Sequence, residues 1–516
     1  MKMNSTLKYE SIAGVVILLL AILAWVLISN PFDPAPPFMD YRSTSAPNTV
    51  PVTEYWPTGG WQTSTPEEQG FDSARLAQGL QKLQQKEYAI DSLLIIRNGR
   101  VILDAYFYPY DGSFPHDLAS VTKSFTTTLI AIAAAQGKLD LDRPMISYFP
   151  DRAIANLDGR KQSITVRDLA RMMNGMESGC LSGDEPTLDA MRSQPDWVQA
   201  ALDRKMQTEP GNSFCYDSPG MHLLSAILQE TTGMTEFEFA RKNLFEPLGV
   251  SEAYWESDPQ GYTRGWGDLH LKPRDAAKLG YLWLHQGMWE EKQIVPAEWV
   301  ADAVKVHSRT GEANNYGNGW WVADNGYAAI GRGTQNIRVY PALNTIVVTS
   351  QDFEYESLGR ILDDALVDPA EPLPANPQGV DKLTAQIAAL TQGARPEPAA
   401  ALPEIAQQIS GKTYQCASNG ANLSSLRFEF SDLYTASLYM NLNNADMTLP
   451  IGLDGNYRLS QEGAAVRGRW KDDQTFVFNI FDIGELTREV RFQGDQLSIT
   501  APEADLTFTC QVQNPE

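Results

Sequence analysis

The order of apolar and polar positions predicts strands at both ends of a large N-terminal region. Residues 92–97 and 100–103 are short runs rich in leucine, isoleucine and valine, and the Asn98-Gly99 pair between them is a strong signal for a two-residue hairpin turn. Mostly helical patterns follow, and strand patterns return at 327–330 and 345–349. We therefore expect an antiparallel sheet that is assembled from both ends of one domain, with helices between them.

Two proline-rich stretches mark the expected domain boundaries. The first covers residues 29–60, and the second covers residues 367–405 around a single expected helix at 382–390. Beyond residue 405 the pattern changes to short alternating runs separated by turn residues, which is typical of a small all-β domain, either a barrel or a sandwich. The predicted domains are therefore residues 61–366, of the α/β (α+β) class, and residues 406–516.

An apolar run at residues 12–28 predicts a transmembrane anchor. The run contains no polar or charged side chain, and it would cover about 25 Å of a hydrocarbon core about 30 Å thick. Lys2 and Lys8 precede it, so residues 1–11 are expected in the cytoplasm and the rest of the chain on the periplasmic side of the inner membrane. A cleaved secretory signal is the alternative, although the run is long for one and lacks an A-x-A site.

The positions of the four cysteines bear on the cellular compartment of the protein. Cys180 and Cys215 lie in one region and Cys416 and Cys510 in another. Three connectivities are possible, but pairing within each region needs no link between domains, and an exported protein would permit both disulfides. Four buried free thiols are the alternative.

The net charge of −23 argues against a nucleic-acid partner, because affinity for nucleic acid comes largely from clustered lysine and arginine.

The strongest candidate chemistry lies in Ser120-Val121-Thr122-Lys123. Ser120 begins an apolar, alanine-rich stretch that predicts a buried helix ending near Gly137. A helix carries positions i and i+3 on one face, so the Lys123 amine can reach the Ser120 hydroxyl and act as its base. The bare pattern is weak, because Ser5-Thr6-Leu7-Lys8 also matches it in the short tail before the apolar run.

A lysine base must be neutral at the working pH. Its pKa must fall from about 10.4 to about 7–8, which burial can achieve. Tyr216, on a turn-rich loop before an apolar helix, is a candidate to share the proton. A G-x-S-x-G match at residues 179–183 lacks the strand-then-helix setting of a nucleophile elbow. The sequence predicts no metal site, because its five histidines show no H-E-x-x-H or comparable spacing of metal ligands. They are His116, His222, His270, His285 and His307.

Three motifs together resemble a known superfamily. Ser120–Lys123, Tyr216–Ser218 and Gly331–Gln335 occur in the order of the three motifs of the class C β-lactamase and penicillin-binding superfamily of serine hydrolases. The resemblance covers residues 65–365, includes connecting segments such as Ile164–Leu169, and is strongest to the esterase and 6-aminohexanoate-dimer hydrolase-like branch. It implies a β-lactamase/transpeptidase-like domain with an antiparallel sheet flanked by helices and a helical subdomain.

The resemblance also implies roles for individual residues. Ser120 would be the acylated nucleophile, Lys123 its general base and Tyr216 the proton shuttle. The segment Gly331–Gln335 would be an edge strand facing Ser120, where the backbone N–H of Thr334 joins that of Ser120 in an oxyanion hole. The substrate would contact Ser218, which replaces the family's usual asparagine, together with Arg332, Gly333 and Gln335. Arg332 is displaced from the expected K-T-G or H-x-G pattern, so it either holds a substrate carboxylate or lies on the surface.

The predicted reaction is acyl transfer through an acyl-Ser120 intermediate that water discharges, without a metal or organic cofactor. The substrate would be a small molecule or peptide with an ester, an amide or a β-lactam bond, and the degenerate third motif makes β-lactams the least favoured. A non-catalytic receptor for cell-wall peptides is the main alternative. A structural adhesin is a third, disfavoured because it leaves the serine–lysine pair without a role. Whether the protein has protein partners cannot be predicted from the sequence.

Overall fold

The computed structural model describes residues 55–85, 90–179, 185–309, 315–350, 355–393, 396, 401–419, 423–442, 445–460, 463–482, 484–502 and 506–513. Among these residues, no helix has both the length and the apolar character needed to cross a bilayer. The predicted anchor at 12–28 lies outside the described residues, as do its flanking segments up to residue 54.

A nine-stranded sheet forms the centre of the first domain. Its strand order is β1-β3-β2-β14-β13-β12-β11-β10-β9, and all neighbours are antiparallel except β1 and β3. The pairing of β2 with β14 joins the early hairpin to the late strands, which confirms the sheet predicted from both ends of the domain. The strands are β1 (Gln62–Thr63), β2 (Ser92–Arg97), β3 (Arg100–Tyr106), β9 (Ser308–Arg309), β10 (Asn315–Tyr316), β11 (Trp321–Ala323), β12 (Gly326–Gly331), β13 (Gln335–Tyr340) and β14 (Thr345–Ser350).

The predicted hairpin turn is present between β2 and β3. Asn98 and Gly99 have φ of 50° and 74°, the left-handed values that a two-residue hairpin turn requires. All six residues of β2 are buried, because alternate side chains point to opposite faces and both faces are covered. Leu94 belongs to one hydrophobic core, and Ile95 belongs to the other.

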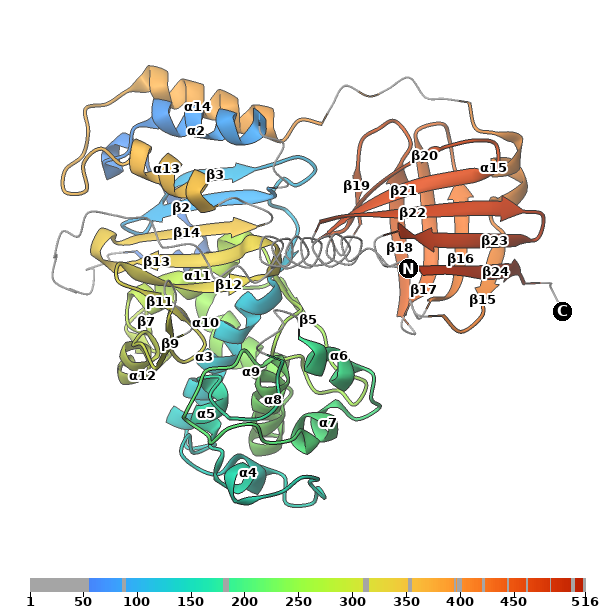
Figure 1. Ribbon diagram of the computed structural model, residues 1–516. Helices are drawn as coiled ribbons and strands as arrows, with labels where there is room; N and C mark the ends of the chain where they lie inside the picture. The colour runs from blue at the N-terminus through green and yellow to red at the C-terminus, as the bar shows by residue number, and fades with distance from the viewer. Residues whose placement is uncertain are drawn as a thin grey trace, which may run out of the picture.

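Helices cover both faces of this sheet (Figure 1). On one face lie α2 (Ser73–Gln85), α13 (Tyr355–Ala365) and α14 (Pro377–Leu390), and on the other lie α11 (Pro273–Leu284) and α3 (Thr122–Ala135). The stretch predicted as a linker at 367–405 is therefore more than a spacer. Its helix α14 is longer than the expected 382–390 and packs on α2 with Leu383 and Leu390 buried, because its apolar side chains complete this core.

A helical region extends from the second face around the central helix α8. Its helices and those near it are α4 (Gly159–Ser163), α5 (Val166–Ala170), α6 (Pro186–Arg192), α7 (Trp197–Asp203), α8 (Ser218–Thr232), α9 (Glu236–Ala240), α10 (Glu246–Leu248) and α12 (Ala297–Ala303). Short strands also occur: β4 (His116–Asp117), β5 (Ala253–Trp255), β6 (Leu269–Leu271), β7 (Met288–Trp289) and β8 (Lys292–Gln293). The 3-10 turns are η1 (Pro57–Gly59), η2 (Glu67–Gln69), η3 (Ala119–Val121), η4 (Met145–Tyr148), η6 (Arg332–Thr334) and η7 (Pro341–Leu343), and η5 (Arg241–Phe245) is a π-helix turn.

The C-terminal domain is one ten-stranded sheet that follows α15 (Glu404–Ile409). Gly452 of β18 pairs with Arg467 of β20, which closes the sheet and selects the barrel of the two predicted alternatives. The strands are β15 (Thr413–Cys416), β16 (Leu423–Phe430), β17 (Thr435–Leu442), β18 (Ala445–Gly452), β19 (Arg458–Leu459), β20 (Ala465–Trp470), β21 (Thr475–Asp482), β22 (Gly484–Gln493), β23 (Gln496–Ala501) and β24 (Leu506–Val512).

One of the two predicted disulfides lies within the described residues, and the other stays a prediction. Cys416 and Cys510 form a disulfide between the paired strands β15 and β24. Cys215 is disulfide-bonded, and Cys180, its predicted partner, lies outside the described residues.

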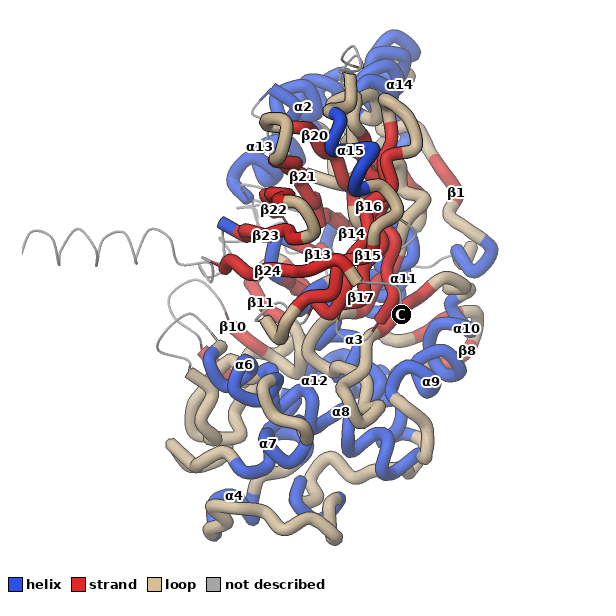
Figure 2. The backbone as a smooth tube through the Cα atoms, turned by 90° about the vertical axis from the view of Figure 1, so that its right-hand side faces the viewer, coloured by secondary structure: helices blue, strands red, loops and turns tan. Residues whose placement is uncertain are grey.

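The two domains meet beside the segment that leads to Ser120. Figure 2 views the molecule from the C-terminal domain, whose strands lie in front of the nine-stranded sheet. The Tyr108 ring lies 6.3 Å from that of Tyr457, and the Tyr110 ring lies 6.1 Å from that of Phe481. Tyr110 Oη also donates a hydrogen bond to the Phe481 carbonyl oxygen at 3.4 Å. The C-terminal domain therefore packs on the chain shortly before the candidate nucleophile.

Candidate active site

Ser120 and Lys123 lie on consecutive turns at the start of the buried helix. Ser120 is in η3, and α3 begins at Thr122, so the predicted helix starts slightly later than expected. Lys123 Nζ donates hydrogen bonds to Ser120 Oγ at 2.8 Å and to the Trp266 carbonyl oxygen at 2.9 Å. The lysine side chain thus faces the serine, as the i, i+3 spacing predicts. Ala119, just before the serine, has φ of 45°, a strained value for a residue with a side chain.

Burial prepares Lys123 to act as a base. The residue is only 2% exposed, and loss of hydration disfavours its charged form. Burial therefore lowers its pKa to about 8, although the negative charges of Glu185, Asp268 and Asp217 oppose the shift. A substantial fraction of the amine is then neutral near pH 8, so it can accept a proton from Ser120.

Tyr216 joins this pair. Lys123 Nζ lies 4.7 Å from the centroid of the Tyr216 ring, and the tyrosine hydroxyl is hydrogen-bonded to Ser120. Burial, together with the negative charge of Glu185, raises the tyrosine pKa well above its usual value, so the phenol stays protonated. The ring stacks on Trp321 at 6.2 Å with an interplanar angle of 17°. The geometry suits a proton donor, while Lys123 suits the base.

A buried ion pair holds the loop that carries Tyr216. The Asp217 carboxylate accepts hydrogen bonds from Nη1 and Nη2 of Arg204, at 2.5 and 3.1 Å, and from Asn174 Nδ2 at 2.7 Å. Both members of the ion pair are buried. Because bidentate arginine–carboxylate pairs fix orientation, this contact positions the residues on either side of Asp217. Those neighbours are Tyr216 and Ser218, the two outer members of the second motif.

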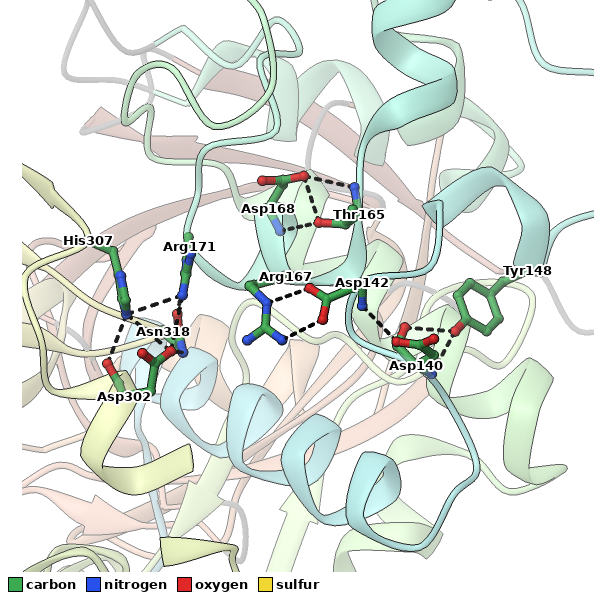
Figure 3. A network of polar contacts seen from close by, with 10 residues as sticks. All are labelled: Asp140, Asp142, Tyr148, Thr165, Arg167, Asp168, Arg171, Asp302, His307 and Asn318. Carbon is green, nitrogen blue, oxygen red and sulfur yellow. Dashed lines mark hydrogen bonds and ion pairs between the residues drawn. The ribbon is translucent and has the colours of Figure 1, made fainter. Parts of the chain in front are cut away.

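A polar network fixes the loop before β11 (Figure 3). Arg171 Nε donates to Asn318 Oδ1 at 2.9 Å, and Arg171 Nη2 lies 3.1 Å from Asp302 Oδ2. Asn318 Nδ2 donates to the same carboxylate at 3.0 Å, and His307 Nε2 lies 2.9 Å from the Asp302 carbonyl oxygen. Arg171 Nη2 also lies 3.4 Å from His307 Nε2, so each of these four residues contacts at least two of the others. The loop is thereby held to α12 and to the end of α5.

This loop in turn reaches the catalytic elements. The Gly319 carbonyl oxygen accepts a hydrogen bond from Ser124 Oγ at 2.6 Å, immediately after Lys123 in α3. Trp321, which stacks on Tyr216, follows two residues later. The group of Arg171, Asp302, His307 and Asn318 in Figure 3 thus supports the loop that contacts both the helix of the base and the ring of the proton donor.

The third motif departs from the expected geometry. Gly331–Gln335 is not an edge strand: Gly331 ends β12, Arg332–Thr334 form the turn η6, and Gln335 begins β13. The strand β12 is not an edge either, because β11 and β13 flank it. Gly333 and Thr334 have φ of 66° and 52°, values that turn the chain back at this point.

The end of β12 still contacts the nucleophile directly. A Cβ atom on Gly331 would lie 2.9 Å from the Ser120 backbone nitrogen and 2.6 Å from the Leu118 carbonyl oxygen, so only glycine fits here. Arg332 is exposed and Gln335 is buried. The Thr334 carbonyl oxygen accepts hydrogen bonds from Asn336 Nδ2 at 2.6 Å and Thr349 Oγ1 at 3.1 Å. The oxyanion role of the Thr334 N–H stays a prediction.

Glu185 is a site residue that the sequence did not reveal. Its Oε1 accepts a hydrogen bond from the backbone N–H of Ser218 at 3.1 Å, and Ser218 itself is buried at the start of α8. The negative charge of Glu185 is the largest charge effect on the pKa of both Lys123 and Tyr216. Its only sequence signal is an acid just before Pro186, which is no more than an ordinary helix start.

Comparison with known proteins agrees with this site. The Beta-lactamase family model matches residues 74–368. The chain belongs to the beta-lactamase family.

Two curated relatives illustrate the family. Protein flp of Staphylococcus aureus is 24% identical over 306 residues, which cover 53% of this chain and 61% of that protein. The 6-aminohexanoate-dimer hydrolase of Paenarthrobacter ureafaciens is 24% identical over 309 residues, 55% of this chain and 79% of that enzyme. A solved structure described as a putative 6-aminohexanoate-dimer hydrolase from Bacillus anthracis has a TM-score of 0.51 at 20% identity, covering 61% of this chain and 89% of that one. The resemblance predicted from the three motifs is confirmed at the level of family and fold.

Proposed function

We propose that this protein is a serine hydrolase that works through an acyl-enzyme on Ser120. The observation that carries the proposal is the 2.8 Å contact between Ser120 Oγ and a buried lysine whose pKa is about 8. A surface lysine would remain charged at pH 8 and could not remove the serine proton. Relatives in the family, including the 6-aminohexanoate-dimer hydrolase, are named as hydrolases.

The reaction proceeds in two halves. Neutral Lys123 takes the proton of Ser120 Oγ as that oxygen attacks the substrate carbonyl, and the backbone N–H groups of Ser120 and Thr334 stabilise the oxyanion. Tyr216 gives its proton to the leaving group and recovers one from Lys123. A water molecule then attacks the acyl-Ser120 ester, with Lys123 and Tyr216 again receiving and returning the proton, and the acid is released.

The substrate is a small molecule or peptide with an ester, amide or β-lactam bond. The name of the aminohexanoate-dimer relative supports the amide. Ser218, Gly333 and Gln335 are proposed to contact the substrate, and the exposed Arg332 to hold a substrate carboxylate. The reaction itself needs only the protein groups and water.

Residues 12–28 are proposed to anchor the enzyme in the inner membrane, with the catalytic domain on the periplasmic side. The apolar run after Lys2 and Lys8 and the disulfide between Cys416 and Cys510 support this location. Fractionation of the full chain, with protease accessibility from the periplasm, tests it. Recovery in the soluble fraction at full length would contradict it.

The chemistry is tested by trapping the intermediate. The full chain is treated with a fluorophosphonate or a labelled penicillin, and peptide mass spectrometry locates the adduct. We expect the label on Ser120, with turnover of p-nitrophenyl butyrate that Ser120→Ala abolishes. A stable label without turnover would favour the receptor for cell-wall peptides, and an unlabelled Ser120 without turnover would refute the hydrolase.

A further inference from the structure

His222 is a buried histidine behind the active site that the proposed reaction does not use. It lies on α8 one turn after Ser218, and its side chain is completely buried. Its Nε2 lies 3.2 Å from Oδ2 of Asp258, whose side chain is completely buried as well. A carboxylate oxygen only accepts hydrogen bonds, so Nε2 carries a hydrogen and donates it to Asp258. The pair therefore links α8 to the loop that follows β5.

Asp258 also organises that loop. Its Oδ1 accepts hydrogen bonds from the backbone N–H groups of Gln260 at 2.8 Å and Tyr262 at 2.9 Å. The Asp258 N–H donates to the Tyr262 carbonyl oxygen at 2.8 Å. The carboxylate thus fixes a turn through one oxygen and receives His222 through the other, so the histidine and the turn hold each other in place.

The His222 ring packs against Trp266, further along the same loop. The two ring centroids lie 5.0 Å apart with an interplanar angle of 78°, an edge-on contact. The ring of Trp197 lies 6.0 Å from that of His222 and 5.6 Å from that of Trp266. The Trp266 carbonyl oxygen accepts a hydrogen bond from Lys123 Nζ at 2.9 Å. Trp266 therefore lies between the histidine and the base.

The Trp266 carbonyl group controls how the Lys123 amine is oriented. A neutral amine has two hydrogens and one lone pair, and the lone pair must face Ser120 Oγ to take its proton. A carbonyl oxygen attracts a hydrogen and repels a lone pair, so it keeps the lone pair of Lys123 directed elsewhere. Because the lysine amine rotates freely at the end of a flexible side chain, this orientation lasts only while the carbonyl group stays in place.

We propose that His222 and Asp258 are positioning residues for the general base, because they hold Trp266 and thereby the carbonyl group that orients Lys123. This inference rests on the proposed hydrolase function. Both side chains are completely buried, so neither touches the substrate. Their loss should slow the proton transfer from Ser120 and leave the affinity for the substrate largely unchanged.

Two variants break the pair, and a third is the control. His222→Phe keeps an aromatic ring against Trp266 but removes the hydrogen bond to Asp258. Asp258→Asn keeps Oδ1 for the turn but presents an N–H to the histidine in place of an acceptor. His285→Phe is the matched control, because His285 is also buried and packs against an aromatic ring, that of Tyr281 at 4.4 Å.

The assays separate the speed of the reaction from binding and from stability. The full chain of each variant is studied at pH 9, above the Lys123 pKa of about 8, so that most of the base is neutral. We measure kcat and KM for p-nitrophenyl butyrate, and the rate at which a fluorophosphonate labels Ser120. Circular dichroism at the assay temperature gives the folded fraction, to which each rate is normalised.

We expect His222→Phe and Asp258→Asn to lower kcat and the labelling rate by about tenfold or more, a part of the 10²–10⁴-fold that general-base catalysis supplies. KM should stay close to the wild-type value, because the groups that contact the substrate are unchanged. His285→Phe should leave kcat, KM and the labelling rate unchanged, even where it lowers the thermal midpoint.

Wild-type kcat and labelling rate in either folded variant would overturn the inference, and so would a change confined to KM. If His222→Phe does not fold, Asp258→Asn decides the outcome. In these cases turnover and labelling of Ser120 by the wild type leave the hydrolase proposal standing. Absence of both in the wild type would overturn the two proposals together.

Discussion

Glu236 offers a sharp test of the electrostatics behind the active site. This first residue of α9 is completely buried, next to the hydroxyl groups of Thr126 and Ser225. Thr126 Oγ1 donates its hydrogen to the Gly265 carbonyl oxygen at 2.8 Å, and Ser225 Oγ donates to the Thr263 carbonyl oxygen at 2.6 Å. Neither hydroxyl has a hydrogen left for the carboxyl group. Both carboxyl oxygens of Glu236 are buried without a hydrogen-bond partner among the described residues, so burial favours the protonated, uncharged form.

The cost of this arrangement depends on pH. Burial raises the Glu236 pKa from 4.5 to about 7. Below about pH 4.5 the group is protonated in both the folded and unfolded chains. Between pH 4.5 and 7 only the unfolded chain loses the proton, so the free energy of unfolding falls by roughly 1.4 kcal/mol per pH unit, or about 3 kcal/mol in total. Above pH 7 both forms are ionised and the loss is complete.

Glu236→Gln removes the titration while keeping an N–H donor and a carbonyl of similar size. The free energy of unfolding of the variant minus that of the wild type should therefore increase by about 3 kcal/mol between pH 4.5 and 7. At neutral pH the variant should be the more stable of the two. Urea unfolding followed by tryptophan fluorescence measures this in the first domain, because Trp470 is the only one of the 12 tryptophans beyond residue 405. Glu298→Gln is the exposed control and should show no such trend. A stability difference that does not change with pH would refute the protonated Glu236.

Three further predictions address the site itself. The kcat/KM for a neutral ester should rise with pH through an apparent pKa of about 8 and then level off, and a midpoint near 6.5 would point to a histidine base instead. Lys123→Ala should lower this kcat/KM by about 10³-fold or more. Asp217→Asn should destabilise the domain by about 3–5 kcal/mol, because Arg204 is left buried without its counter-charge; an unchanged urea midpoint would contradict this. Gly331→Ala should lower kcat by about 10²-fold and lower the stability by about 1–3 kcal/mol, because the new Cβ clashes with backbone atoms of Leu118 and Ser120. A wild-type kcat would show that the strand end can move aside.

Local signals in the sequence predicted the parts of the fold that depend on neighbouring residues. Asn98-Gly99 specified the hairpin, and the spacing of Ser120 and Lys123 placed them on one helical face. The prediction that Gly331–Gln335 forms an edge strand was wrong, because a glycine-rich segment fits either a strand or a turn and only its contact with Ser120 decides between them. The helix predicted at 382–390 was too short for a similar reason. The packing of α14 on α2 stabilises additional helical residues despite the proline-rich composition around them.

Glu185 shows most clearly why some residues of the site could not be predicted from the sequence. An acid before Pro186 is ordinary in sequence, and it becomes significant only where α6 and α8 bring it beside Ser218. There it opposes the effect of burial on Lys123: burial lowers the lysine pKa, and Glu185 raises it. A site selected only for a strong base at low pH would omit that carboxylate, because it makes the lysine harder to deprotonate. The Lys123 pKa of about 8 therefore reflects a balance between burial, which lowers it, and the nearby carboxylates, which raise it, and this balance exists only once the chain has folded.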